Sequence, residues 1–226
     1  MINNFENADK AIKIGDLKTF IDIIECEPDI NICDPNGLTY LMLASMSPYT
    51  YYMENLYARG VNNINQKNKL GNTALIAASL CNNIETIKKL IEYGANVNDV
   101  NNDGGTALTH SQNIECITCL VEHGANVNHA ANNNGTVLSK SVSSGNTASV
   151  QYLLNNGADV NHIVNDFTYL MVATICNRID CIPILINHGV DIDYVNRSGK
   201  TVLDLTTNPE IKKLIIEYRN TNFVLK

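Results

Sequence analysis

Cys116, Cys119 and His123 form the tightest cluster of residues that could do chemistry. Their spacing, Cys-x-x-Cys-x-x-x-His, would place all three on one face of a helix. Two thiolates and an imidazole can bind zinc, with His110 or His129 as a fourth ligand. The alternative is that all three occupy exposed helix positions that tolerate most residues, and the chain has no second Cys-x-x-Cys pair. A zinc or redox site is therefore the less favoured hypothesis, and no cofactor is expected.

Composition argues against several classes of function. The net charge of −7 and the pI of about 5.1, without a Lys/Arg cluster, disfavour nucleic-acid binding. No apolar run reaches the roughly 18 residues that cross a bilayer, so no membrane span is expected. We find no nucleophile–base arrangement and no phosphate loop, and we predict that the protein is not an enzyme. The seven scattered cysteines suit a reducing compartment, and a cytoplasmic location is expected.

The elements that would position these side chains come from a repeat. Six threonines are each followed two residues later by leucine: Thr39, Thr73, Thr106, Thr136, Thr168 and Thr201. Their spacings are 34, 33, 30, 32 and 33 residues. A period near 33 held over six copies predicts a stack of similar units.

Each period predicts a helix, a turn, a second helix and a projecting loop. The threonine can accept a backbone N–H as the N-cap of a short first helix, and a small residue such as Ala78 follows five positions later. Apolar residues at helical spacing then form a second helix, which ends at Gly94, Gly124, Gly157 or Gly189. No unit has enough apolar surface to fold alone, so the units are expected to share a continuous core.

The phrases YGANVN (93–98), HGANVN (123–128) and NGADVN (156–161) resemble the exit of the ankyrin repeat. The resemblance covers nearly the whole chain and implies an all-α fold, an ankyrin-repeat solenoid of stacked helix-turn-helix units with projecting hairpin loops. We expect a single domain, 1–226. It is divided into an N-terminal capping repeat at 1–33, internal repeats at 34–67, 68–100, 101–130, 131–162 and 163–195, and a C-terminal capping repeat at 196–226.

Several positions depart from the family pattern, since no copy keeps its T-P-L-H start. The third repeat is three residues short between Leu108 and Ile114, which predicts a missing turn in its first helix. Pro183 lies inside a second-helix pattern and predicts a lost backbone bond or a kink. Asp166 stands where Gly71 stands in the second copy, and Asp tolerates left-handed conformations better than most residues.

The resemblance implies binding of a protein partner, of unknown identity, on a concave face made of hairpin tips and first helices. The tips differ between copies, as a binding face would, and the acidic chain favours a basic contact patch on the partner. Tyrosines at two of the family's proline positions could anchor an interface near this face. The predicted contact residues are Lys69, Asn101, Asn102, Asn133, Asp166, Phe167, Arg197, Tyr40 and Tyr169.

Resemblance to the family also implies a modification. Ankyrin repeats are substrates of an asparaginyl hydroxylase that targets the Asn closing the exit phrase, eight residues after a second-helix leucine. Asn98, Asn128 and Asn161 fit this pattern. In structural terms, each is expected to be a hairpin residue whose side chain bonds its own backbone.

The leading hypothesis is a monomeric, non-enzymatic protein–protein interaction module. The chain holds 34 Asn in 226 residues, and its short Asn- and Ile-rich repeats are similar to the ankyrin proteins of giant DNA viruses. That similarity implies action on host proteins in the host cytoplasm. The alternatives are an adaptor that recruits a target to a ubiquitin ligase, a structural or self-assembling component, and the zinc or redox site at Cys116, Cys119 and His123.

Overall fold

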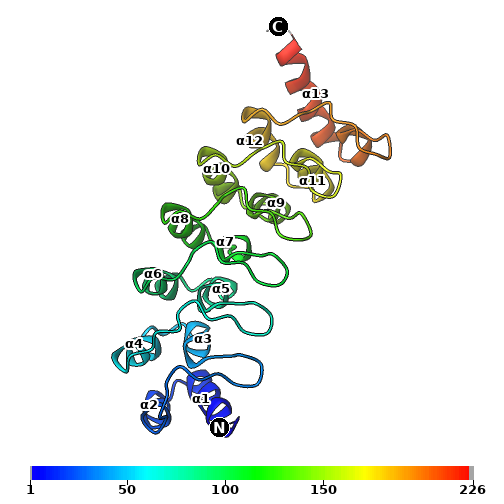
Figure 1. Cartoon of the computed structure of the whole chain (residues 1–226). Helices are drawn as coiled ribbons and strands as arrows, with labels where there is room; N and C mark the ends of the chain where they lie inside the picture. Colours follow the sequence, from blue (N-terminus) through cyan, green and yellow to red (C-terminus); the bar gives the residue numbers. More distant parts are fainter. Residues whose placement is uncertain (1, 224–226) are drawn as a thin grey trace. The chain divides into compact units, whose positions relative to one another are not determined.

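The computed structural model describes residues 2–223, and they form pairs of helices joined by long loops (Figure 1). The chain divides into two compact units, Met1–Asn126 and Val127–Lys226, and each is described by itself. Within residues 2–223, strand-like pairing is limited to two isolated bridges, Cys33–Thr39 and Val164–Phe167. The predicted all-α fold is therefore confirmed. No helix of the described part is long and apolar enough to cross a membrane.

The first unit contains four helix pairs. We call the first helix of a pair helix A and the second helix B. The helices are α1 (Ile2–Ile14), α2 (Leu17–Glu25), α3 (Tyr40–Ser45), α4 (Tyr51–Ala58), α5 (Ala74–Leu80), α6 (Ile84–Glu92), α7 (Ala107–His110) and α8 (Ile114–Glu122). The A helices pack against one another in sequence, α6 packs on α8, and the loops project beyond the A helices (Figure 1). The first pair shows that the N-terminal capping repeat has its own helix A, α1, which the sequence had not indicated.

The second unit continues the same pattern. Its helices are α9 (Val137–Ser144), α10 (Thr147–Asn155), α11 (Tyr169–Ile175), α12 (Cys181–Asn187), the 3₁₀ helix η1 (Val202–Leu205) and α13 (Pro209–Phe223). Here α9 packs on α11, α11 on η1, and α10 on α12. In the C-terminal capping repeat the short η1 takes the place of helix A and α13 takes the place of helix B. Helix α13 contributes the buried Ile211 and Ile215 to the core.

The repeated threonines are N-caps, as predicted. Thr73, for example, has an extended backbone, and its hydroxyl oxygen accepts the N–H of Ile76 at 3.3 Å. This bond satisfies one of the helix N–H groups that has no partner within the helix, and losing it costs about 1 kcal/mol. The small residue five positions later is buried, at 0% exposed for Ala78 and 5% for Ser141. The α-helical A helices that follow Thr39, Thr106, Thr136 and Thr168 are capped in the same way.

Glycines end the B helices in the left-handed conformation, also as predicted. Gly94 and Gly189 have φ of 90° and 84°, which side chains with a Cβ rarely adopt. Asp166 has φ of 73°, so it does replace Gly71 in the left-handed conformation.

The two irregularities predicted for the third repeat and for Pro183 have different outcomes. Helix α7 has only 4 residues against 7 in α5, which confirms the missing turn. The expected kink at Pro183 is wrong, because α12 begins only at Cys181 and Pro183 is its third residue. The first N–H groups of a helix have no intrahelical acceptor, so proline removes no helix bond there.

Candidate functional site

The Cys116, Cys119 and His123 cluster does not form a metal site. Cys116 is 0% exposed and Cys119 is 6% exposed, so the prediction of three positions on one exposed face is wrong. The reason is the packing of the B helices, in which Cys116 occupies the position of the equally buried Thr86. The Nδ1 atom of His123 donates to the carbonyl of Cys119 at 2.7 Å. Within residues 2–223, no group of three His, Cys, Asp or Glu side chains could hold a metal ion.

The buried thiols are also poorly suited to redox chemistry. Burial raises the pKa of Cys116 to about 11, and it raises the pKa of Cys119 as well. Because the thiolate is the reactive form, these side chains are protonated and inert near neutral pH.

Tyr40 and Tyr169 belong to the core, so their assignment as exposed partner anchors is wrong. They are 0% and 1% exposed. The Tyr40 hydroxyl donates to Glu27 at 3.0 Å, and its ring stacks on Phe5 with 4.3 Å between centroids. A side chain at the first position of helix A thus lies against the preceding repeat. This placement buries it between repeats instead of presenting it to a partner.

The hairpin tips expose four of the predicted contact residues. Lys69, Asn102, Asn133 and Arg197 are exposed, and Arg197 keeps 92% of its side chain accessible. These tips therefore combine cationic and amide side chains in an otherwise acidic chain.

Asn101 is a structural residue, which corrects its assignment to the contact set. It is 9% exposed. Its Oδ1 accepts the N–H groups of Asp103 and Gly105 at 3.1 and 2.8 Å. Its amide nitrogen donates to Asn72 Oδ1 at 3.0 Å. A carbonyl at this position ties the loop to itself, in the way that Asx turns do, and leaves no free polar group for a partner.

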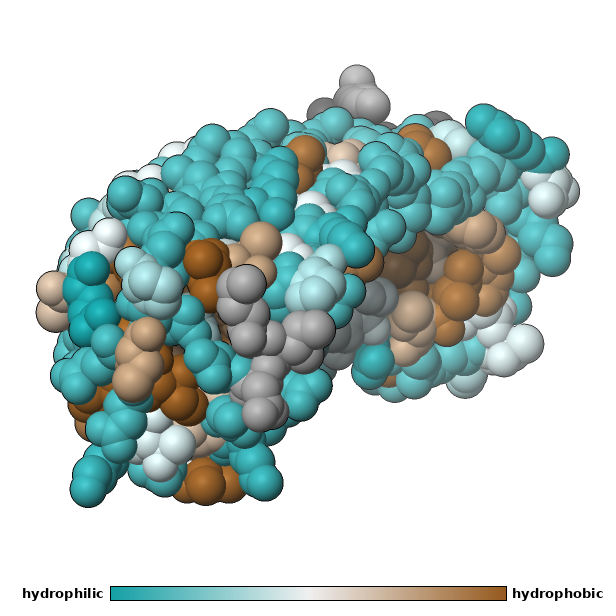
Figure 2. Space-filling view, turned by 60° about the horizontal axis from the view of Figure 1, so that its bottom comes forward, coloured by the Kyte–Doolittle hydropathy of each residue, from teal (hydrophilic) through white to brown (hydrophobic). Residues whose placement is uncertain are grey.

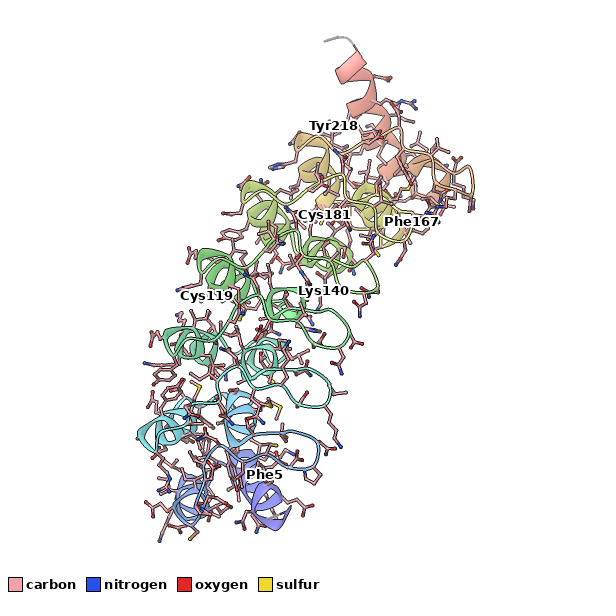
Figure 3. The ribbon with its side chains drawn as sticks, in the orientation of Figure 1. Phe5, Cys119, Lys140, Phe167, Cys181 and Tyr218 are labelled. Atoms are coloured by element: carbon pink, nitrogen blue, oxygen red, sulfur yellow. The ribbon has the colours of Figure 1, made fainter. Side chains whose placement is uncertain are left out.

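Phe167 and Asp166 are half-buried at the hairpin before α11, and Figure 3 labels Phe167 there. Asp166 Oδ2 accepts the N–H of Arg197 at 2.8 Å, and its Oδ1 accepts the hydroxyl of Tyr194 at 3.2 Å. Asp166 is therefore occupied in joining two hairpins, although part of its surface remains accessible.

Neighbouring hairpins are joined within each unit. In the first unit the N–H of Lys69 donates to Asn36 O at 2.8 Å, and the N–H of Asn102 donates to Leu70 O at 3.0 Å. In the second unit Asp166 makes the corresponding link to Arg197. The side chains of Lys69, Asn102 and Arg197 thus stand on backbones that the adjacent repeat holds in place, which lowers the entropy lost on binding.

The three asparagines of the exit phrase bond the next repeat, not their own backbone. Asn128 donates from Nδ2 to Gly157 O at 2.9 Å and accepts the N–H of Asp159 at 2.8 Å. Asn161 makes the same pair of bonds to Gly189 and Asp191. Asn98 makes it to Gly124 and Asn126. Each side chain joins the end of one helix B to the exit of the preceding repeat.

A fourth asparagine, Asn65, makes the same pair of bonds to the next repeat, and the sequence pattern did not predict it. Asn65 donates to Gly94 O at 3.3 Å and accepts the N–H of Asn96 at 2.9 Å. Its exit phrase, VNNIN (61–65), contains one residue more than the others, so a count from the helix-B leucine fails. The helix-ending Gly60 was the available signal. Lys140 on α9, labelled in Figure 3, was also missed; it is half-buried, and burial lowers its pKa.

Two of three comparisons place this chain among known proteins. A family model described as ankyrin repeats (3 copies) matches residues 9–101 and 97–164. The crystal structure of the ankyrin repeat domain of human ASB11 is similar, with a TM-score of 0.83 and 21% sequence identity. That similarity covers 93% of this chain and 96% of the other. A comparison with curated protein sequences gave no match.

Proposed function

The chain belongs to the ankyrin repeat family, and we propose that it is a non-enzymatic module that binds a partner protein through its hairpin tips. The observation that carries the proposal is the set of exposed tip residues, which are Lys, Asn or Arg in different repeats, while the backbone N–H groups of Lys69, Asn102 and Arg197 are bonded to neighbouring hairpins. A fixed backbone with varied side chains suits specific recognition over an extended surface. Partner contact residues are Lys69, Asn102, Asn133 and Arg197, with Asp166 and Phe167 beside them.

The charge of the chain indicates the chemistry of the partner. The net charge is −7, and one face, shown in Figure 2, is covered mainly by hydrophilic residues with small hydrophobic patches between them. An acidic surface favours encounter with a basic one, and the effect weakens with salt. We infer that the partner presents a basic patch, which meets acidic residues beside the tips, such as the exposed Asp103, and not the cationic Lys69 and Arg197.

We also propose that the chain acts as a monomer on host proteins in the cytoplasm of a host cell. The similarity of its Asn-rich repeats to viral ankyrin proteins supports the host-cell role. The ubiquitin-ligase adaptor is less well supported, because Ile211 and Ile215 in the last described helix are both 0% exposed and serve packing. Sedimentation velocity of the purified chain separates the monomer from a self-assembling component.

The test is cross-linking and affinity capture with mass spectrometry, using lysate of the natural host cell. Wild type is compared with a variant carrying Lys69→Ala, Asn102→Ala, Asn133→Ala and Arg197→Ala. A control variant changes exposed residues of α1 and α2 instead, with Lys10→Ala and Lys18→Ala. We expect a partner that the tip variant loses and the control keeps. A partner list unchanged in the tip variant would contradict binding on the hairpin side.

A further inference from the structure

A groove of 630 Å³ lies between α6 and α8. Figure 1 shows these two B helices next to each other in the first unit. The groove lies on the B-helix side of the unit, away from the hairpin loops, and we call it the outer groove. Figure 3 labels Cys119, which contributes to its lining from α8. The outer groove shares no residue with the tip surface described above.

The floor of the outer groove is apolar. Ile84 and Ile114 are half-buried at equivalent positions of the two helices, so each leaves part of its side chain open to solvent. Thr118 adds a methyl group, and Cys119 is 6% exposed. Apolar surface that stays accessible in a concavity is suited to covering by apolar side chains of a ligand.

The rim of the outer groove is acidic. Glu85 and Glu92 stand at the two ends of α6, and Glu115 and Glu122 stand at the two ends of α8. The two glutamates of each helix are seven residues apart, which corresponds to about 10 Å along the axis.

Only part of this negative charge is compensated within the chain. Lys88 pairs with Glu85 at 3.0 Å, and Lys89 pairs with Glu92 at 3.3 Å. In the described part of the chain, no ion pair involves Glu115 or Glu122. The α8 side of the groove therefore offers two carboxylates to a cation from outside.

The B helices α4 and α10 do not carry this combination. The positions that hold the two glutamates are occupied by Tyr51 and Ala58 in α4 and by Ala148 and Asn155 in α10. A general need for solubility does not explain why two neighbouring helices carry all four carboxylates around one apolar groove.

We propose that the outer groove binds a basic amphipathic helix of a partner protein. The apolar side chains of the ligand helix cover Ile84 and Ile114. Arg or Lys residues seven apart on the same helix pair with Glu115 and Glu122. The spacing matches because residues seven apart on a ligand helix are also about 10 Å apart on one face. This second surface binds independently of the hairpin tips.

The probe is a fluorescein-labelled peptide of about 15 residues, long enough to form a helix on binding. It is built from Ala and Leu, with Arg at two positions seven residues apart. Binding to the full chain is followed by fluorescence anisotropy at low and at high salt. We expect saturable binding that weakens with salt.

Three variants test the site. Glu115→Gln with Glu122→Gln removes the two unpaired rim charges of α8 and leaves Glu85 and Glu92, and we expect binding about fivefold weaker at low salt. The matched control is Glu6→Gln with Glu25→Gln, which changes the net charge equally at exposed positions outside the groove and leaves binding unchanged. Thr118→Trp fills the floor without a change of charge and abolishes binding, while circular dichroism confirms that the variant is folded.

Equal weakening by the rim variant and its control would show unspecific charge attraction and overturn the proposal. No saturable binding of the probe, or binding that Thr118→Trp leaves intact, would also overturn it. Self-association of the chain that Thr118→Trp abolishes, without peptide binding, would assign the groove to a second copy and reject a basic helix. Lys69→Ala with Asn102→Ala leaves peptide binding unchanged, which separates this surface from the tips.

Discussion

The hydroxyl of Tyr169 lies 2.7 Å from Oγ1 of Thr136, the residue one repeat earlier that caps α9. Both side chains are buried, at 1% and 5% exposed. Tyrosine at the family's proline position therefore bonds the N-cap of the preceding repeat. This hydrogen bond links two neighbouring repeats through buried side chains.

Replacement of Tyr169 by Phe removes this bond and keeps the ring. We expect the free energy of unfolding to fall by about 1 kcal/mol, because a buried neutral hydrogen bond contributes about that much. Urea denaturation followed by circular dichroism measures the change. The control is Tyr49→Phe, since Tyr49 is 49% exposed and should lose almost nothing. Equal stability of the Tyr169 variant and wild type would show that the bond does not contribute.

Buried tyrosines predict a loss of stability at alkaline pH. Burial raises the pKa of Tyr169 from 10.0 to about 12, and it raises the pKa of Tyr52 to about 12 as well. The folded state thus favours the neutral phenol, so its contribution is complete below pH 10 and is lost between pH 10 and 12.

For Tyr169 alone, a raised pKa of this size corresponds to about 2 to 3 kcal/mol at high pH. Denaturation curves recorded across pH 9 to 12 should show the midpoint falling, and phenolate absorbance should appear together with unfolding. Tyr169→Phe should make the fall shallower. A fall of the same steepness in that variant would assign the alkaline transition to other groups.

The bonds that the exit-phrase asparagines make to the next repeat predict unequal effects of two substitutions at Asn128. Asn128→Ala removes both the bond to Gly157 O and the bond from the Asp159 N–H, with an expected loss of about 2 kcal/mol. Asn128→Asp keeps the acceptor and loses the donor, so the loss should be smaller. Thermal denaturation measures both, and Asn187→Ala serves as an exposed control on α12. Equal losses for Ala and Asp would mean that the accepted bond contributes nothing.

Periodicity predicted the helix pairs well because the capping threonines and helix-ending glycines are local signals. Thr73 caps α5 and Gly94 ends α6 for reasons that each residue carries in itself. Pro183 was misread because helix α12 starts two residues later than the repeat pattern implies. The start of a helix depends on packing, which a single pattern does not contain.

The candidate site was less predictable because burial depends on neighbouring repeats. Tyr40 and Cys116 both stand at positions that sequence alone cannot assign to the surface or the core. Tyr40 is buried by Phe5 on α1, a helix without a family signature. The outer groove was not predicted either, because it needs two helices side by side before Glu115 and Glu122 frame one surface.

Two glycines with similar backbones predict how closely the hairpins approach each other. Gly60 and Gly71 have φ of 84° and 77°, so alanine is strained at both and costs about 1 to 2 kcal/mol. At Gly60 a Cβ would meet nothing within 4 Å, whereas at Gly71 it would lie 2.6 Å from the backbone nitrogen of Asn102 in the next hairpin.

Because that clash is with backbone, Gly71→Ala can be accommodated only if the two hairpins separate. We expect Gly71→Ala to cost at least about 1 kcal/mol more than Gly60→Ala in urea denaturation. Amide hydrogen exchange should also speed up at Asn102, whose N–H donates to Leu70 O. If the two alanine variants are equally stable and exchange at Asn102 is unchanged, the hairpins are not held in contact. The proposal that neighbouring hairpins hold the tip surface in place would then lose its support.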